Sequence, residues 1–133
     1  MARATKPATA VAWKNEPDAH DYPAAADYLS LIASAQRVAS MVAALQKAPV
    51  VTKKAKDLLR AARLPLLADD NAHVAADLDK VHKGVPLSPV LVIQGDLVKG
   101  LPAQIADGYH RICASYHVDE NTEIPCRIVA WDD

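Results

Sequence analysis

The chain has 133 residues, a formal net charge of −1 at pH 7 and a hydrophobic fraction of 51% that includes no phenylalanine. This length suffices for one domain with its own core, and the balanced charge lacks the basic excess on which nonspecific nucleic-acid binding depends. No segment resembles a signal peptide or is apolar over the thickness of a bilayer, so we expect a cytoplasmic protein. The two cysteines and five histidines lack the spacing of a metal site.

The N-terminal third predicts an arm followed by a long helix. Residues 1–20 mix Ala, Thr, Pro and Lys without a period, which is typical of a flexible or loosely docked arm. Trp13 is the one side chain there that is expected to pack onto the body or a partner. Apolar residues at a helical period then predict one amphipathic helix over Asp21–Lys47. Its apolar stripe is either core or an interface with a second copy or a protein partner.

A second helix is predicted to begin at Thr52, which can serve as its cap, and to end before Pro65. Residues 21–64 are therefore expected to form a helical segment that packs on the core. Basic residues cluster in this second helix, and a solvated helix face explains them better than a DNA interface. They are Lys53, Lys54, Lys56, Arg60 and Arg63.

Residues 65–133 predict a β–β–α–β arrangement after one more helix, so the fold class is α+β. Asp69, Asp70 or Asn71 can cap that helix, and Gly84 can end it. A continuous apolar run such as the next one is typical of a buried strand. The elements predicted after Gly84 are strands at Pro89–Ile93 and Ala103–Ala106, a helix over Gly108–His117 and a strand at Ile124–Ala130.

The segment from Ile105 to Ala114 is the most informative part of the chain. It predicts a strand, a glycine turn and a helix whose first turn carries His110 and Arg111. Cationic groups are unfavourable at a helix N-terminus, so a bound anion is one explanation for them, held by free amides and the guanidinium. The alternative is that Arg111 pairs with Asp107 and that His110 is simply exposed. The helical spacing predicts a core-facing side made of Tyr109, Ile112, Cys113 and Tyr116, and a ligand-facing side made of His110, Arg111 and Ala114.

Three motifs in this half resemble the ParB/sulfiredoxin-like superfamily. The first is a helix that ends at Gly84 and is followed by Leu87–Val92, in which a proline precedes an apolar strand. The second is Asp107–Ala114, which reads DGYHRICA and resembles the signature D-G-x-H-R-x-x-A. The third is Ile124–Val129, which is similar to a closing I-P-V/C-x-V-V strand. The resemblance extends over Leu66–Ala130, about half of the chain, and implies a small mixed β-sheet with helices.

The resemblance also implies a phosphate or nucleotide at the turn before the last helix. The residues that match Gly108, His110 and Arg111 surround the phosphates in members that act on nucleotides, and Ser88 would add a polar lining. Tyr109 belongs to the same turn and stands where sulfiredoxins carry their catalytic cysteine, so the chain is not expected to be a sulfiredoxin. No recognition helix of the kind found in partition-type ParB proteins is evident, so nucleic acid is not an expected partner.

We therefore expect a phosphate- or nucleotide-binding protein whose ligand is ATP or another nucleotide, with or without Mg²⁺. If the site is catalytic, the reaction is phosphoryl transfer or phosphate hydrolysis. His110 is then the candidate acid–base residue, and Asp107 and Glu120 are the acidic residues available as bases. Asp69 and Asp70 are available to Mg²⁺, although helix capping explains them better. The alternatives are a noncatalytic interaction or regulatory module of the same fold and, with less support, a DNA-binding protein.

Overall fold

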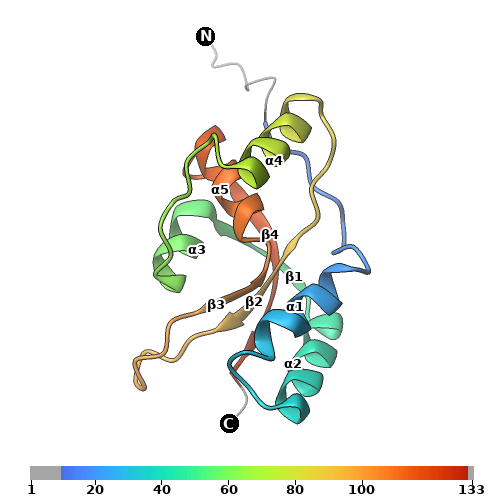
Figure 1. The fold of residues 1–133 in the computed structure, drawn as a ribbon, viewed down its shortest axis with the longest axis vertical. Coiled ribbons are helices and arrows are strands. Elements are labelled where there is room, and N and C mark those ends of the chain that lie inside the picture. Colours follow the sequence, from blue (N-terminus) through green and yellow to red (C-terminus); the bar gives the residue numbers. More distant parts are fainter. Residues whose placement is uncertain (1–9, 132–133) are drawn as a thin grey trace.

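A four-stranded β-sheet separates two layers of helices in the computed structural model, which describes residues 10–131 (Figure 1). The strand order is β1-β4-β2-β3; β4 runs parallel to β2, and the other neighbouring pairs are antiparallel. The predicted α+β fold with a mixed sheet is thus confirmed. The elements are α1 (Asp21–Leu29), α2 (Ala35–Lys47), β1 (Val50–Lys54), α3 (Ala55–Ala62), α4 (Ala72–His82), β2 (Val90–Gln94), β3 (Gln104–Asp107), α5 (Tyr109–Val118) and β4 (Glu123–Ala130).

Strand β2 is buried on both faces, which explains the continuous apolar run in its sequence. Val90 and Val92 pack into a core with α3, α4 and α5, whereas Leu91 and Ile93 pack into a second core with α1 and α2. This alternation follows from the two-residue period of a strand. A strand that is covered on both sides has no polar face, so its whole sequence is apolar.

The single long helix predicted over Asp21–Lys47 is wrong. The chain forms two helices, α1 and α2, that are joined by a turn and cover the same face of the sheet (Figure 1). Ser34 starts α2, because its side-chain oxygen accepts a hydrogen bond from the Arg37 amide at 3.3 Å. An unbroken helix would extend about 40 Å, too far for both halves to cover one sheet face. The buried residues of these two helices are therefore core, whereas Tyr28, Leu31 and Ile32 are exposed. A partner interface on this segment stays a prediction.

The predicted start of the second helix is also wrong. Thr52 does not cap a helix, since Val50–Lys54 forms the edge strand β1 and α3 begins at Ala55. The β-branched residues of this stretch favour an extended backbone, and β4 supplies their hydrogen-bonding partners. Pairing with a strand that is distant in sequence thus overrides a local capping signal. Lys53 and Lys54 consequently lie on a strand instead of a helix face.

The boundaries predicted for α4 agree with the structure. The side chain of Asn71 accepts hydrogen bonds from the amides of His73 and Val74, at 3.0 and 3.2 Å, and so caps the helix. Gly84 follows the helix with a φ of +73°, the left-handed conformation in which helices commonly end. The strands and the helix predicted after Gly84 are present within two residues of their expected bounds.

The described part of the N-terminal arm is docked on the body. Trp13 packs against the core that contains α3, α4 and α5, and backbone hydrogen bonds join Ala12 and Lys14 to Leu87. The remainder of the predicted flexible arm, residues 1–9, lies outside the described residues. Over residues 10–131, none of the helices has the length and hydropathy needed to span a bilayer.

Helix α5 buries a wider face than its periodicity predicts. Ile112 and Cys113 are fully buried, as expected, but Ala114 is fully buried too, although it was predicted to face a ligand. The reason is that α4 packs along α5 and covers a side that a lone helix on a sheet would leave open. Cys113 is the small buried residue expected of a free cysteine, and burial raises the pKa of its thiol.

Candidate functional site

The turn between β3 and α5 holds Gly108 in a conformation that other residues rarely adopt. Its φ is +115°, and it forms the N-cap of α5 without a side-chain cap. A Cβ at this position would lie 2.4 Å from Cγ1 of Val90 on the adjacent strand β2. Glycine is therefore required by the positive φ and by the close approach of β2. The result is a helix that begins without a capping side chain on its first amides, the arrangement in which anions bind at helix starts.

Arg111, in the first turn of α5, is held by acceptors of the protein itself. Its Nη2 lies 3.0 Å from Asp107 Oδ2 and 3.8 Å from Asp21 Oδ2, and it donates to the Pro89 carbonyl at 3.3 Å. The ion pair with Asp107 that the sequence offers as an alternative is thus present. All three contacts use Nη2, and Nε is buried without a hydrogen-bond partner among residues 10–131. The guanidinium therefore retains donor capacity.

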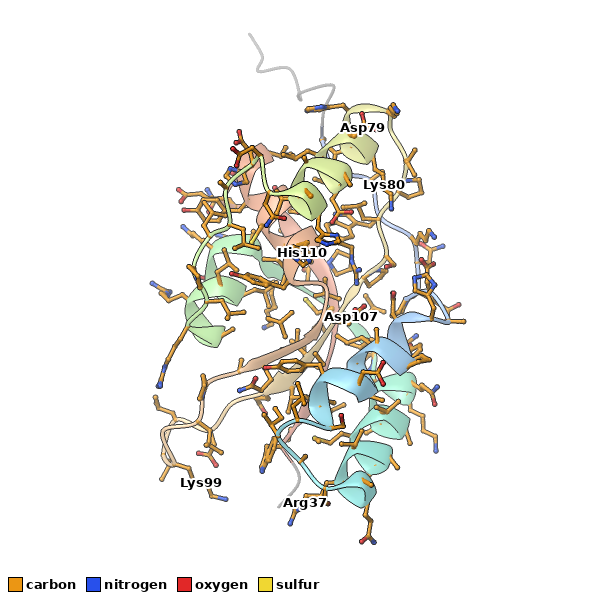
Figure 2. The ribbon with its side chains drawn as sticks, in the orientation of Figure 1. Arg37, Asp79, Lys80, Lys99, Asp107 and His110 are labelled. Atoms are coloured by element: carbon orange, nitrogen blue, oxygen red, sulfur yellow. The ribbon has the colours of Figure 1, made fainter. Side chains whose placement is uncertain are left out.

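His110 faces helix α4. Its ring centroid lies 4.8 Å from that of His73, with the two rings tilted by 43°. Figure 2 shows His110 between α4 and Asp107. The side chain is partly buried, so the alternative in which His110 is simply exposed is wrong. Residues that are separate in the sequence thus surround the start of α5.

Two cavities meet at Arg111. The first, of about 270 Å³, lies between α4 and the start of α5. The second, of about 250 Å³, is bounded by the N-terminal arm and the segment before β2. Arg111, Asp77 and Lys80 line both cavities. The other residues of the first cavity are His73, Ala76, Asp107, Gly108 and His110.

Three residues of the first cavity, Asp77, Asp107 and His110, have shifted pKa values. Burial raises the pKa of Asp77 and of Asp107, in both cases against the attraction of the Arg111 guanidinium. Burial lowers the pKa of His110, and the neighbouring His73 lowers it further. Both effects favour the neutral form of His110. Shifted acids and bases that share a cleft are typical of functional sites.

The pKa of His110 is expected to move in opposite directions in two neighbouring variants. His73→Asn removes a group that lowers this pKa and should raise it, whereas Asp77→Asn removes a carboxylate that raises it and should lower it further. Because the folded-state pKa lies below the unfolded value, the contribution of His110 to stability is complete above the unfolded pKa and is lost as the pH falls through the folded pKa. A proton NMR titration of the imidazole measures both shifts, and shifts of the same sign would contradict the assignment.

Ser88 and Tyr109, the other two predicted ligand-binding residues, lie on different sides of the turn. Ser88 is buried and lines the second cavity, next to Arg111. The Tyr109 hydroxyl instead donates to the Pro65 carbonyl at 2.6 Å, and this side chain lines neither cavity. Only the backbone amide of Tyr109 belongs to the helix start at which a ligand would bind.

Glu120, predicted as a catalytic base, is not near the other candidates. It follows the far end of α5, where its carboxylate accepts a hydrogen bond from the Tyr116 hydroxyl at 3.3 Å. The length of α5 places it about 12 Å along the helix axis from His110, so the two cannot act on one reacting centre. Asp69 and Asp70, considered as Mg²⁺ ligands, line neither cavity, and Asn71 is the cap of α4.

A second cluster of titratable groups lies at the start of α1. The potential ligand atoms of Asp18, His20 and Asp21 lie within 4.8 Å of one another. Their carboxylates already have protein partners, since Asp18 pairs with Lys14 at 2.7 Å and Asp21 accepts a hydrogen bond from the Asp18 amide at 3.0 Å. The turn before α1 and the contact with Arg111 account for this cluster, and we assign no metal to it.

Three titratable residues of the first cavity could not be assigned to the site from the sequence, namely His73, Asp77 and Lys80. They occupy positions i, i+4 and i+7 of α4 and therefore lie on one face of that helix, while Val74 and Val81 are buried in the core. This i, i+4, i+7 spacing indicates from the sequence alone that the three side chains share one helix face. A polar helix face ordinarily indicates solvent, however, and only the packing of α4 along α5 turns this one into the wall of a cavity.

Comparisons of the chain with protein-family models, with curated proteins and with solved structures found no match. The resemblance to the ParB/sulfiredoxin-like superfamily therefore stays a prediction that rests on the motifs within residues 66–130. Any functional conclusion depends on the geometry around the start of α5.

Proposed function

We propose that this protein binds a phosphate-bearing ligand, with a nucleotide such as ATP as the leading candidate, in the cavity between α4 and the start of α5. The observation that carries the proposal is the convergence of His73 and Lys80 from α4 with the Gly108 turn, His110 and Arg111. Six of the eight lining residues are titratable, which suits a charged ligand better than an apolar one.

Lys80 is the cation best suited to meet the phosphate. It is exposed, lines both cavities and forms no ion pair with another described residue. Arg111, by contrast, has its Nη2 engaged by Asp107 and Asp21. The ligand would therefore draw on Lys80, on the amides of the first turn of α5 and on the remaining Arg111 donors. In this proposal Arg111 mainly holds the turn in position.

The other groups of the cavity suit phosphate chemistry as well as binding. Neutral His110 can donate a hydrogen bond to a phosphate oxygen or accept a proton from an attacking nucleophile. Asp77 is the carboxylate that would meet Mg²⁺ carried in by a nucleotide, because this ion needs only one or two protein carboxylates besides the phosphates. The resemblance to the superfamily implies the same class of ligand. Whether the protein also catalyses phosphoryl transfer or hydrolysis is tested by an activity assay, separately from binding.

Lys80→Ala is expected to weaken binding of the nucleotide about tenfold or more, because one charge-assisted contact contributes about 1.5–3 kcal/mol. Thermal shift and calorimetry with ATP, ADP, AMP and inorganic phosphate, each with and without Mg²⁺, measure the effect. Lys83→Ala is the matched control, since Lys83 directly follows the same helix, is exposed and lines neither cavity. Its affinity should equal that of the wild type.

The absence of any stabilisation at ligand concentrations far above a micromolar Kd would contradict the proposal, because a ligand that binds only the folded state must raise its stability. Equal losses in Lys80→Ala and Lys83→Ala would also contradict it, since they would indicate general charge attraction. Release of inorganic phosphate from ATP then tests for catalysis. If the site is catalytic, His110→Asn should slow this release by about 10²–10⁴-fold.

A further inference from the structure

The hairpin between β2 and β3 carries an apolar tip at the opposite end of the molecule from α4. Figure 2 labels Lys99 at this tip and Asp79 on α4. Leu97 and Val98 are 96% and 97% exposed, the highest values among the large apolar side chains of residues 10–131. The tip is ordered locally, since the Asp96 carboxylate accepts hydrogen bonds from the amides of Val98 and Lys99. Exposed apolar side chains held in a fixed position are typical of interaction sites.

An apolar groove lies between this hairpin and α3. Its volume is about 480 Å³, within the range of specific binding pockets. The groove reaches the core of the protein, because the buried residues Leu58 and Val92 line it. Leu97 and Leu101 of the hairpin line it as well, so the groove and the exposed tip form one continuous apolar surface. Its other apolar lining residues are Ala61, Pro102, Ala103 and Ile128.

The groove is lined by three cations, Lys53, Arg60 and Arg63, and by two carboxylates, Asp57 and Asp96. Arg60 pairs with Asp57 at 3.2 Å, but Lys53 and Arg63 form no ion pair within the part of the chain that the structure describes. Arg63 also has a φ of +57°, the one positive value outside glycine among these residues. Glycine is the residue that favours this position after a helix, so an arginine there costs strain energy. A role for the guanidinium at the groove offers a reason for that strain.

We propose that this groove docks an acidic segment of a partner protein that carries large aliphatic side chains. The aliphatic groups would fill the space between Leu58, Val92 and Leu97, and the acidic groups would meet Lys53 and Arg63. The apolar floor does not suit nucleic acid, which would need polar or stacking contacts. This surface is distinct from the cavity beside α5, so the docking function goes beyond the proposed ligand binding.

The test is selection of a displayed library of random linear peptides against the full chain. The selected peptides should combine Asp or Glu with Leu, Ile or Val. Arg63→Gly should weaken their binding about tenfold or more, the loss expected for one charge-assisted contact, and Leu97→Asp should abolish it. Arg63→Gly should also raise the melting temperature, because glycine relieves the strained backbone, so its loss of binding cannot be ascribed to unfolding.

Three variants serve as controls. Lys47→Ala removes an exposed cation from α2, and Leu31→Asp changes an exposed leucine in the turn between α1 and α2. Both should leave peptide binding unchanged. Lys80→Ala should also leave it unchanged, which separates failure of this proposal from failure of ligand binding beside α5.

Four results would overturn the proposal. They are the lack of an enriched peptide, an enriched peptide without acidic residues, binding that Arg63→Gly leaves intact, and binding to phosphatidylserine vesicles in place of peptides. The last result would assign the apolar tip and its neighbouring cations to a membrane surface.

Discussion

Arg111→Met is expected to lower the free energy of unfolding by about 3–5 kcal/mol at pH 7, the range measured when one partner of a buried ion pair is removed. Methionine keeps most of the aliphatic stem but leaves Asp107 and Asp21 without their shared cation. Their side chains are 17% and 3% exposed, so water cannot readily replace it. Urea denaturation followed by circular dichroism measures the loss.

The loss should depend on pH with a defined sign. Arg111 opposes the upward shift of the Asp107 pKa, so this pKa rises further in Arg111→Met. A carboxyl group whose pKa is raised on folding contributes stability that is complete below its unfolded pKa and is lost as the pH rises through its folded pKa. The deficit relative to the wild type should therefore be larger at pH 8 than at pH 5. Asp107→Asn in the Arg111→Met background should recover much of the stability and remove this dependence. A deficit independent of pH would contradict the role assigned to the ion pair.

Because Arg111→Met is expected to destabilise the fold, Arg111 is a poor residue at which to test ligand binding by mutation. A variant of Arg111 that fails to bind has also lost the contacts that hold the start of α5, so the two effects are confounded. Lys80 is exposed and contributes no ion pair within residues 10–131. Its removal therefore changes the cavity without changing the core, and it is the better probe.

Gly108→Ala is expected to lower the free energy of unfolding by about 2–5 kcal/mol. The φ of +115° strains any residue with a Cβ, at about 1–2 kcal/mol. The Cβ would also lie 2.4 Å from Cγ1 of Val90, and overpacking of this kind costs about 1–3 kcal/mol. Thermal and urea denaturation both measure the total loss from backbone strain and overpacking.

Gly84→Ala separates the two contributions. Gly84 has a φ of +73°, but a Cβ there would meet no atom within 4 Å, so only the conformational strain of about 1–2 kcal/mol is expected. Val90→Ala should be less harmful in the Gly108→Ala background than alone, because it removes Cγ1, the atom nearest to the added Cβ. Equal losses in Gly84→Ala and Gly108→Ala would show that β2 can move away and that the turn is not tightly packed.

The parts of the fold that could be predicted from the sequence are those with local causes. Asn71 caps α4 through its own side chain, and Gly84 ends the helix through its own backbone. The apolar run of β2 and the glycine turn before α5 are likewise features of a few adjacent residues. The break between α1 and α2 and the extended β1 could not be predicted, because both depend on a sheet that includes β4, at the other end of the sequence.

The candidate site likewise has a part that is predictable from adjacent residues and a part that depends on packing between distant ones. Asp107, Gly108, His110 and Arg111 are adjacent in sequence, and their backbone alone places them at one turn. The residues of α4 that face them, and Asp21 beneath Arg111, become neighbours only through packing. Glu120 is predicted only as an available base, and the length of α5 separates it from the turn.

The most direct test of ligand binding at the start of α5 is an amide NMR titration of the ¹⁵N-labelled protein with inorganic phosphate and then with ATP. Binding at this turn should give saturable shifts at the amides of residues 108–112 and at Lys80, with none of comparable size near the hairpin tip. Saturation should need about tenfold more ligand, or still more, in Lys80→Ala but not in Lys83→Ala. Unchanged spectra in both titrations, or shifts centred away from Gly108, would contradict it.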